Sequence, residues 1–202
     1  MIAARCTSLL AVACMLSGDA FQGAPQPPWG LGPNSVIPIN VPAAVRSAVT
    51  DFEYDETDSI RGVVVDLNRD GFVDYLIASA PSLCGTGGCT YAVVEGATER
   101  AMGQFFGSAL YVRAEMAHGY PVIGALGYVA GSSANYTTYT FNGTAFVVTS
   151  TRLVTGASLD RLLATLRRIP MWRPRPGANR SVRIPTSAAM FSCRAAAPVR
   201  PG

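Results

Sequence analysis

The sequence predicts an α+β domain in which an antiparallel β-sheet packs against one or two short amphipathic helices. Three observations indicate this fold class. Short runs rich in valine, tyrosine and threonine are separated by glycine and asparagine, as in antiparallel strands. Asn142 and Gly143 stand between two of these runs, which is typical of a β-hairpin. Two further segments carry apolar residues at helical spacing.

The composition fits one domain with a substantial core. Of the 202 residues, 49% are hydrophobic and 14% are charged, which excludes wholesale disorder. No apolar stretch of about 18 residues follows the N-terminal segment, so no transmembrane span is expected in the mature chain. Residues 41–169 carry 9 Arg against 12 acidic residues, and this mildly acidic body gives no reason to expect a specific nucleic-acid partner.

The first 20 residues have the layout of a secretory signal peptide. Arg5 precedes an apolar run at 9–16, and small residues lead to Ala20. We therefore expect residues 1–20 to be removed and the protein to be exported, to the periplasm or to the outside of the cell. A buried N-terminal helix is one alternative, and a lipid anchor at Cys14, which follows a weak lipobox-like sequence, is another.

The remaining elements follow in order. Residues 21–40 hold five Pro, three Gly and no charge, which predicts an extended linker with Trp29 docking on the domain. The folded domain is expected over 41–169 and begins with a short amphipathic helix near 42–52, where Pro42 suits the first turn. Short strands are predicted after it, at 63–65, 75–77, 91–94, 109–112 and 122–129.

The predicted hairpin joins residues 136–141 and 144–149 through a two-residue turn, which pairs Tyr139 with Phe146. A second helix is predicted to begin at Ser158, its N-cap, and to end before Pro170. Its apolar stripe is expected to cover one face of the sheet and consists of Leu159, Leu162, Leu163, Leu166 and Ile169.

The C-terminal segment 170–202 is basic and rich in proline, with six Arg, six Pro and no acidic residue. We expect a flexible, disordered tail. The alternative is a binding arm for a protein partner or for an anionic surface such as phosphates or lipid head groups. Cys193 lies in this tail, and the sequence assigns it no role.

Residues 66–74, Asp-Leu-Asn-Arg-Asp-Gly-Phe-Val-Asp, form the strongest functional motif. Oxygen-bearing side chains stand at positions 1, 3, 5 and 9, and glycine stands at position 6. Ca²⁺ takes about six to eight oxygen ligands, and alternate residues of a tight loop direct their side chains at one centre. The predicted Ca²⁺ ligands are Asp66, Asn68, Asp70, Asp74 and the main-chain carbonyl of Phe72.

This loop departs from an EF-hand in two respects. Position 12, where an EF-hand has a bidentate glutamate, is Ile77, so a further ligand must come from water or another segment and the affinity should be modest. The flanking residues have strand character, which predicts a calcium-loaded strand–loop–strand connection. Mg²⁺ and Mn²⁺ suit the loop less, because they prefer strict octahedral sites. The alternative without a metal is an Asp- and Asn-rich hairpin loop.

Cys84 and Cys89 enclose a short loop with three glycines and are expected to form a disulfide in an exported protein. The glycines allow so short a loop to bring the two Cβ atoms together. A zinc site is one alternative, although it needs about four ligands and only Cys193 and His118 remain to help. A redox-active pair is the other, although the spacing is not Cys-x-x-Cys.

The succession VVVDLNRDGFVDYLI and CGTGGCTYAV, within residues 61–95, resembles a group of small exported proteobacterial proteins. These proteins combine an FG-GAP/VCBS- or dockerin-like DxNxDGxxD calcium loop with a CGxGGC turn. The resemblance implies Ca²⁺ on Asp66, Asn68, Asp70 and Asp74 and a disulfide from Cys84 to Cys89, and it implies no activity. A propeller of FG-GAP repeats is not expected, because it needs several copies of the loop and this chain has one.

The sequence shows no catalytic signature. His118 is the only imidazole, lysine is absent, and no nucleophile elbow, P-loop, dinucleotide fingerprint or HExxH motif occurs. We therefore expect a non-enzymatic, exported calcium-binding protein with a structural ion. One alternative is a periplasmic protein-binding or inhibitor module that presents the Cys84–Cys89 loop or the tail. Another is a metal-dependent hydrolase, which a pocket beside the loop lined by Glu95 or Glu115 would favour.

Overall fold

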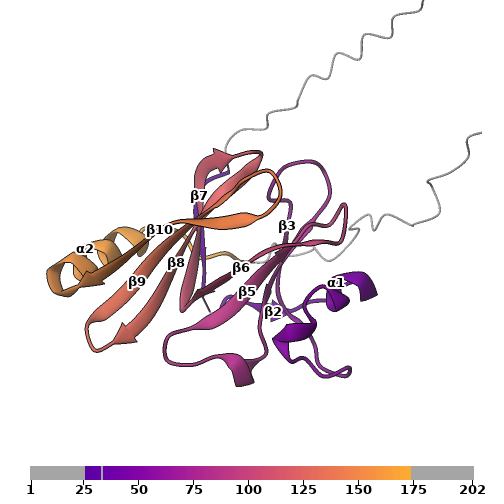
Figure 1. The fold of residues 1–202 in the computed structure, drawn as a ribbon, viewed down its shortest axis with the longest axis horizontal. Coiled ribbons are helices and arrows are strands. Elements are labelled where there is room, and N and C mark those ends of the chain that lie inside the picture. Colours follow the sequence, from indigo (N-terminus) through magenta and orange to yellow (C-terminus); the bar gives the residue numbers. More distant parts are fainter. Residues whose placement is uncertain (1–25, 33, 174–202) are drawn as a thin grey trace, which may run out of the picture.

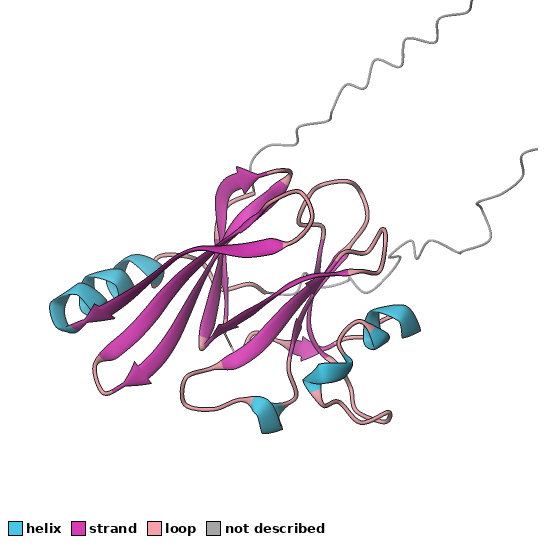
Figure 2. Ribbon diagram, in the orientation of Figure 1, coloured by secondary structure: helices cyan, strands magenta, loops and turns pink. Residues whose placement is uncertain are grey.

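The computed structural model describes residues 26–32 and 34–173. Over these residues the chain forms ten β-strands in two five-stranded antiparallel sheets, with a short helix outside each sheet (Figures 1 and 2). The strand order is β1-β7-β8-β9-β10 in the first sheet and β2-β3-β4-β5-β6 in the second. The antiparallel sheet and short helices that the sequence predicts are therefore present, with β-structure dominant.

The first sheet joins one early strand, β1 (Trp29–Leu31), to four strands that follow one another later in the chain: β7 (Ala109–Ala117), β8 (Tyr120–Ala130), β9 (Ser133–Phe141) and β10 (Phe146–Thr155). The second sheet follows chain order: β2 (Ile37–Pro38), β3 (Arg61–Val65), β4 (Asp74–Ala78), β5 (Cys89–Val94) and β6 (Ala101–Gly107). The helices are α1 (Ala43–Ser47) and α2 (Gly156–Leu166), and the 3-10 helices are η1 (Thr50–Phe52) and η2 (Pro81–Leu83).

Three apolar clusters hold these layers together. The largest fills the space between the two sheets, and its aromatic centre consists of Phe105, Tyr120, Tyr139, Phe141 and Phe146. A second cluster packs α1 and η1 against the outer face of β4 and β5, and a third packs α2 against β7–β10. Both faces of each sheet are thus covered in part, and α1 and α2 lie at opposite ends of the molecule (Figure 1).

The two helices differ in detail from the sequence prediction. The helix expected near 42–52 is divided into α1 and η1, which together bury Val45 and Phe52. α2 begins at Gly156 with Thr155 as its N-cap, so Ser158 is not the cap. Its leucine stripe does cover the sheet as predicted, with Leu159 and Leu166 buried. None of the described helices has the length and apolar character needed to cross a membrane.

The segments expected to flank the domain contribute to it. Within residues 21–40, β1 joins the first sheet beside β7 and β2 joins the second sheet beside β3, so this stretch is not simply a linker. The Gly30 amide donates to the Pro170 carbonyl at 2.9 Å, and the Trp172 amide donates to the Gly30 carbonyl at 2.7 Å. Trp29 docks in the core as predicted. The proposed signal peptide and most of the basic tail lie outside the described residues.

The register of the β9–β10 hairpin was predicted wrongly. Phe141 pairs with Phe146 and Tyr139 pairs with Val148, so the loop has four residues, 142–145, instead of two. The Asn142 side chain explains the difference, because its Oδ1 accepts hydrogen bonds from the Thr144 and Ala145 amides at 2.9 and 3.0 Å. These bonds stabilise a wider turn. The shift is two residues, so Tyr139, Phe141 and Phe146 still face the core.

Candidate metal-binding loop

The acidic motif lies in the loop that joins β3 to β4. The two strands are antiparallel, and Val65 pairs with Asp74 at the base of the loop. The local arrangement is therefore the strand–loop–strand connection that the sequence predicts, and not the helix–loop–helix of an EF-hand.

The loop curls around the oxygens of its own side chains. Arg69 and Gly71 have left-handed backbone conformations, with φ of 63° and 89°, which tighten the turn. Asp66 Oδ2 accepts a hydrogen bond from the Gly71 amide at 3.0 Å, and Asp70 Oδ1 accepts one from the Phe72 amide at 2.8 Å. Asn68 Oδ1 accepts one from the Asp70 amide at 3.2 Å. Asp66, Asn68 and Asp70 thus turn toward the inside of the loop.

Asp74 connects this loop to the neighbouring β5–β6 turn. Its side chain is fully buried, and its Oδ2 accepts a hydrogen bond from the Leu67 amide at 2.9 Å while its Oδ1 accepts one from the Gly96 amide at 3.1 Å. Burial raises the pKa of Asp74 to about 6; the two amide bonds oppose this shift, and the negative charges of Asp70 and Asp66 add to it. The negative charges of Asp66 and Asp70 therefore act on Asp74 and disfavour its ionised form.

One oxygen of Asp66 is left without a partner. Asp66 Oδ1 is buried and accepts no hydrogen bond from the part of the chain that the structure describes. A buried carboxylate oxygen without a donor is energetically costly, and a bound cation is one of the few groups that could satisfy it.

A second layer of side chains stands behind the loop. Asn68 Nδ2 donates to Asp70 Oδ2 at 2.8 Å and to the Tyr120 hydroxyl at 3.0 Å, and this hydroxyl donates to Glu95 Oε1 at 2.8 Å. Burial, with the negative charges of Asp74, Glu95 and Asp70, raises the pKa of Tyr120, so its hydroxyl stays protonated. Glu95 is a candidate from the sequence alone, whereas Tyr120 is not, because only the pairing of β8 in the other sheet brings Tyr120 to the loop.

The remaining predicted residues are not gathered at this point. The Phe72 side chain is 41% exposed, which agrees with a role for its carbonyl only. Glu115 forms an exposed ion pair with Arg113 on β7, and His118 is exposed in the β7–β8 turn. Over the described ranges, no three side chains of His, Cys, Asp or Glu form a group that could hold a metal ion as it stands.

The two cysteines form the predicted disulfide. Cys84 and Cys89 are bonded, with their Cα atoms 4.3 Å apart. Between them the Gly85 and Gly88 amides each donate to the other residue's carbonyl, at 2.9 and 3.1 Å. Gly88 has a φ of 133° and lies against Gly107 of β6 so closely that a Cβ atom would overlap its backbone. The glycines therefore permit both the tight loop and its contact with the sheet.

Comparisons of the chain with protein-family models, with curated proteins and with solved structures find no match. The structure is that of a two-sheet antiparallel β-protein with an acidic hairpin loop and a local disulfide.

Proposed function

We propose that this protein is an exported, non-enzymatic calcium-binding protein, with one structural Ca²⁺ on the β3–β4 loop. The observation that carries the proposal is the buried Asp66 Oδ1, which has no hydrogen-bond partner in the described residues, whereas the side-chain oxygens of Asn68 and Asp70 on the same loop accept hydrogen bonds. Ca²⁺ binds carboxylate, amide and carbonyl oxygens, and its charge would offset the electrostatic repulsion among the neighbouring carboxylates of the loop.

The ligand set is Asp66, Asn68, Asp70, Asp74 and the Phe72 carbonyl. Asp66, Asn68 and Asp70 already turn inward on the same loop, and Asp74 lies within their electrostatic field. A carboxylate oxygen that accepts one amide hydrogen bond keeps a lone pair for a cation. The hydrogen bonds from Tyr120 to Glu95 and from Asn68 to Tyr120 would orient the amide ligand in the way that second-shell groups orient metal ligands elsewhere.

We assign the ion a structural role because its ligands join two hairpins. Asp74 holds the β3–β4 loop to the β5–β6 turn through Leu67 and Gly96. An ion at the centre of the loop would link Asp66 and Asp70 to Asp74, which the β5–β6 turn already holds. Its positive charge would also remove the electrostatic repulsion among these three carboxylates. The pocket lined by Arg61, Tyr91 and the disulfide lies at the other end of this hairpin, away from the loop.

Export supports the same proposal. The first 20 residues have the layout of a signal peptide, and outside the cytoplasm a disulfide persists and calcium reaches about the millimolar range that weak extracellular sites need. The mass of the mature protein tests this part. We expect a chain that begins after Ala20, so that Cys14 is removed with the signal peptide, and that has lost the mass of two hydrogens to the disulfide. A retained N-terminal segment without lipid would contradict export by this route.

Calorimetric titration of the full chain with Ca²⁺, after chelator treatment, tests calcium binding. We expect saturable binding of one ion, which Asp70→Ala abolishes. Asp160→Ala is the matched control, because Asp160 is an exposed aspartate on α2, and it should leave the titration unchanged. A flat titration of the chelator-treated wild type would overturn the proposal, and so would equal binding by the two variants.

A further inference from the structure

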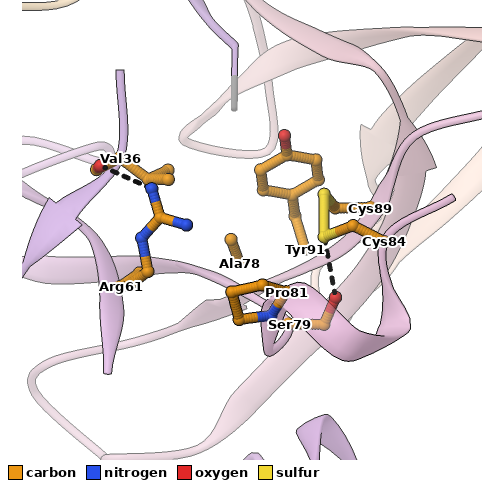
Figure 3. A pocket seen from close by; sticks show the side chains of 8 residues that line it. All are labelled: Val36, Arg61, Ala78, Ser79, Pro81, Cys84, Cys89 and Tyr91. Carbon is orange, nitrogen blue, oxygen red and sulfur yellow. Dashed lines mark hydrogen bonds between the residues drawn. A yellow bond between two sulfur atoms is a disulfide. The ribbon is translucent and has the colours of Figure 1, made fainter. Parts of the chain in front are cut away.

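A pocket of about 200 Å³ lies at the end of the β3–β4 hairpin opposite the acidic loop. Figure 3 shows Tyr91 and the disulfide on one side of this space and Val36 and Arg61 on the other. The lining residues are Val36, Arg61, Ala78, Ser79, Pro81, Cys84, Cys89 and Tyr91. None of them belongs to the proposed calcium ligands, so this pocket is a separate feature.

The floor of the pocket is buried and mainly apolar. The side chains of Val36, Ala78 and Cys89 are at most 5% exposed and present carbon and sulfur to the space. Arg61 is half-buried at the rim, where its Nη2 donates to the Val36 carbonyl at 3.4 Å. The guanidinium is thus already engaged, and we count Arg61 as part of the wall only.

Tyr91 places an unused hydrogen-bond donor in this floor. Its side chain is fully buried, and its hydroxyl oxygen has no hydrogen-bond partner among the described residues. Burial raises the pKa of Tyr91 to about 12, although the charge of Arg61 opposes this shift, so the hydroxyl keeps its proton. Most buried hydroxyl groups are paired, so an unpaired one in a pocket wall indicates that an acceptor is missing.

Ser79 adds a second hydroxyl to the same floor. It is 2% exposed, and its Oγ contacts Cys84 Sγ at 3.9 Å, which is a weak interaction. A single water molecule would serve this floor poorly, because a buried water needs about two to four polar partners and takes up about 30 Å³. The pocket is several times larger than that, and its other floor residues are apolar. The missing acceptor therefore belongs to a larger molecule.

We propose that this pocket binds a small neutral carbonyl compound whose apolar body is about the size of one ring. The Tyr91 hydroxyl donates to the carbonyl oxygen, and the apolar body packs on Val36, Ala78 and the disulfide. The ligand is neutral because the floor residues carry no charge, and burying an ionised group without a counter-charge is costly. A dry cavity of about 150 Å³ holds benzene, so the volume suits a ligand of this size.

Cyclohexanone is the probe, and methylenecyclohexane is its counterpart of similar shape, in which a CH₂ group replaces the carbonyl oxygen. Ligand-observed NMR titrations of the full chain should show saturable binding of cyclohexanone. The ratio of cyclohexanone affinity to methylenecyclohexane affinity should fall about tenfold in Tyr91→Phe, because this ratio separates the hydrogen bond from apolar burial. Tyr75→Phe is the matched control, because Tyr75 is buried on the outer face of the same sheet, and it should leave the ratio unchanged.

Cyclohexanecarboxylate carries the same ring with a negative charge and should bind more weakly than cyclohexanone, by about tenfold or more. The proposal is overturned if cyclohexanone does not bind, if the affinity ratio changes equally in Tyr91→Phe and Tyr75→Phe, or if the carboxylate binds as tightly as the ketone.

Two further measurements locate the ligand and check the free hydroxyl. Nuclear Overhauser effects should connect bound cyclohexanone to the Ala78 methyl group on the pocket floor, and contacts only with other parts of the protein would overturn the site. Ligand-free Tyr91→Phe should melt at the same temperature as the wild type or higher, because it loses an unpaired buried hydroxyl. A clearly lower melting temperature would mean that the hydroxyl already has a partner, which would also overturn its proposed role.

Discussion

A substitution at Gly96 tests whether Asp74 fastens the acidic loop to the β5–β6 turn. A Cβ atom built on Gly96 would overlap the carbonyl oxygen of Val73, which is backbone and cannot turn aside. Gly96→Ala must therefore push the turn away from the loop, and the hydrogen bond from the Gly96 amide to Asp74 Oδ1 would lengthen or break. Gly85→Ala is the matched control, because a Cβ atom on Gly85 meets nothing within 4 Å.

The magnitude follows from two contributions. Forcing an extra carbon into a closed contact costs about 1–3 kcal/mol, and losing a buried hydrogen bond to a carboxylate costs about 1.5–3 kcal/mol. Gly96→Ala should thus lower the free energy of unfolding by about 3–5 kcal/mol. Gly85→Ala should change it by about 1 kcal/mol or less, because alanine fits there and only restricts the unfolded chain.

Urea unfolding in the presence of a chelator, followed by the fluorescence of Trp29 and Trp172, measures both variants without a contribution from metal. Trp29 is buried in the core, so its emission should report global unfolding. If Gly96→Ala unfolds at the same urea concentration as Gly85→Ala, the β5–β6 turn does not depend on contact with the loop and the prediction is wrong.

Three further predictions concern the charge of Asp74, the disulfide and α2. Because the folded protein holds the pKa of Asp74 at about 6, above its usual 3.8, the folded state binds the proton more tightly than the unfolded chain. The metal-free protein should therefore gain stability, by up to about 3 kcal/mol, as the pH falls from about 6 to 4, whereas its Ca²⁺ affinity should fall because the ion needs the ionised carboxylate. Urea midpoints and calcium titrations at several pH values measure the two effects. A loss of stability between about pH 6 and 4 would contradict the predicted gain. Replacing Cys84 and Cys89 together by serine should cost about 2 kcal/mol in urea unfolding, since a disulfide that closes so short a loop restricts the unfolded chain only modestly; an unchanged midpoint would contradict this. Leu159→Ala, on the buried face of α2, should cost about 2–4 kcal/mol, whereas Leu153→Ala on exposed β10 should cost almost nothing, and equal losses would show that α2 does not pack on the sheet as described.

The sequence was informative where structure depends on neighbours along the chain. The leucine stripe of α2, the strands around the acidic loop and the short Cys84–Cys89 loop all have local causes, and each is present. The boundaries were less predictable, because they depend on single hydrogen bonds. Asn142 Oδ1 binds two amides and widens a turn that the Asn-Gly pair alone predicts to be tight.

Features that depend on distant partners were not predictable. β1 is three residues long and acquires its strand geometry from β7, and the Pro- and Gly-rich composition around it indicates only a linker. β6 was missed because its buried residues Met102 and Phe105 are three positions apart, whereas buried residues on one face of a strand are two positions apart. A register shift in the pairing opposite Val93 and Val94 accounts for this spacing.

The candidate sites divide in the same way. The proposed calcium ligands lie within nine consecutive residues and are visible as a motif. Tyr120 stands behind Asn68 only because β8 crosses near the loop in the folded chain. The pocket lined by Arg61, Tyr91 and the disulfide needs β3, β4, β5 and η2 to be in place, and of its residues only Cys84 and Cys89 stand out in the sequence. Spacing therefore identifies a local metal loop, whereas a site assembled from separate strands requires the fold.

A crystal structure of the full chain grown with Ca²⁺, with anomalous data to identify the ion, would show whether the β3–β4 loop binds calcium. We expect a calcium peak inside the β3–β4 loop, about 2.3–2.6 Å from oxygens of Asp66, Asp70 and the Phe72 carbonyl. This expectation would be contradicted by a loop whose aspartates stand apart with no ion between them at a saturating calcium concentration.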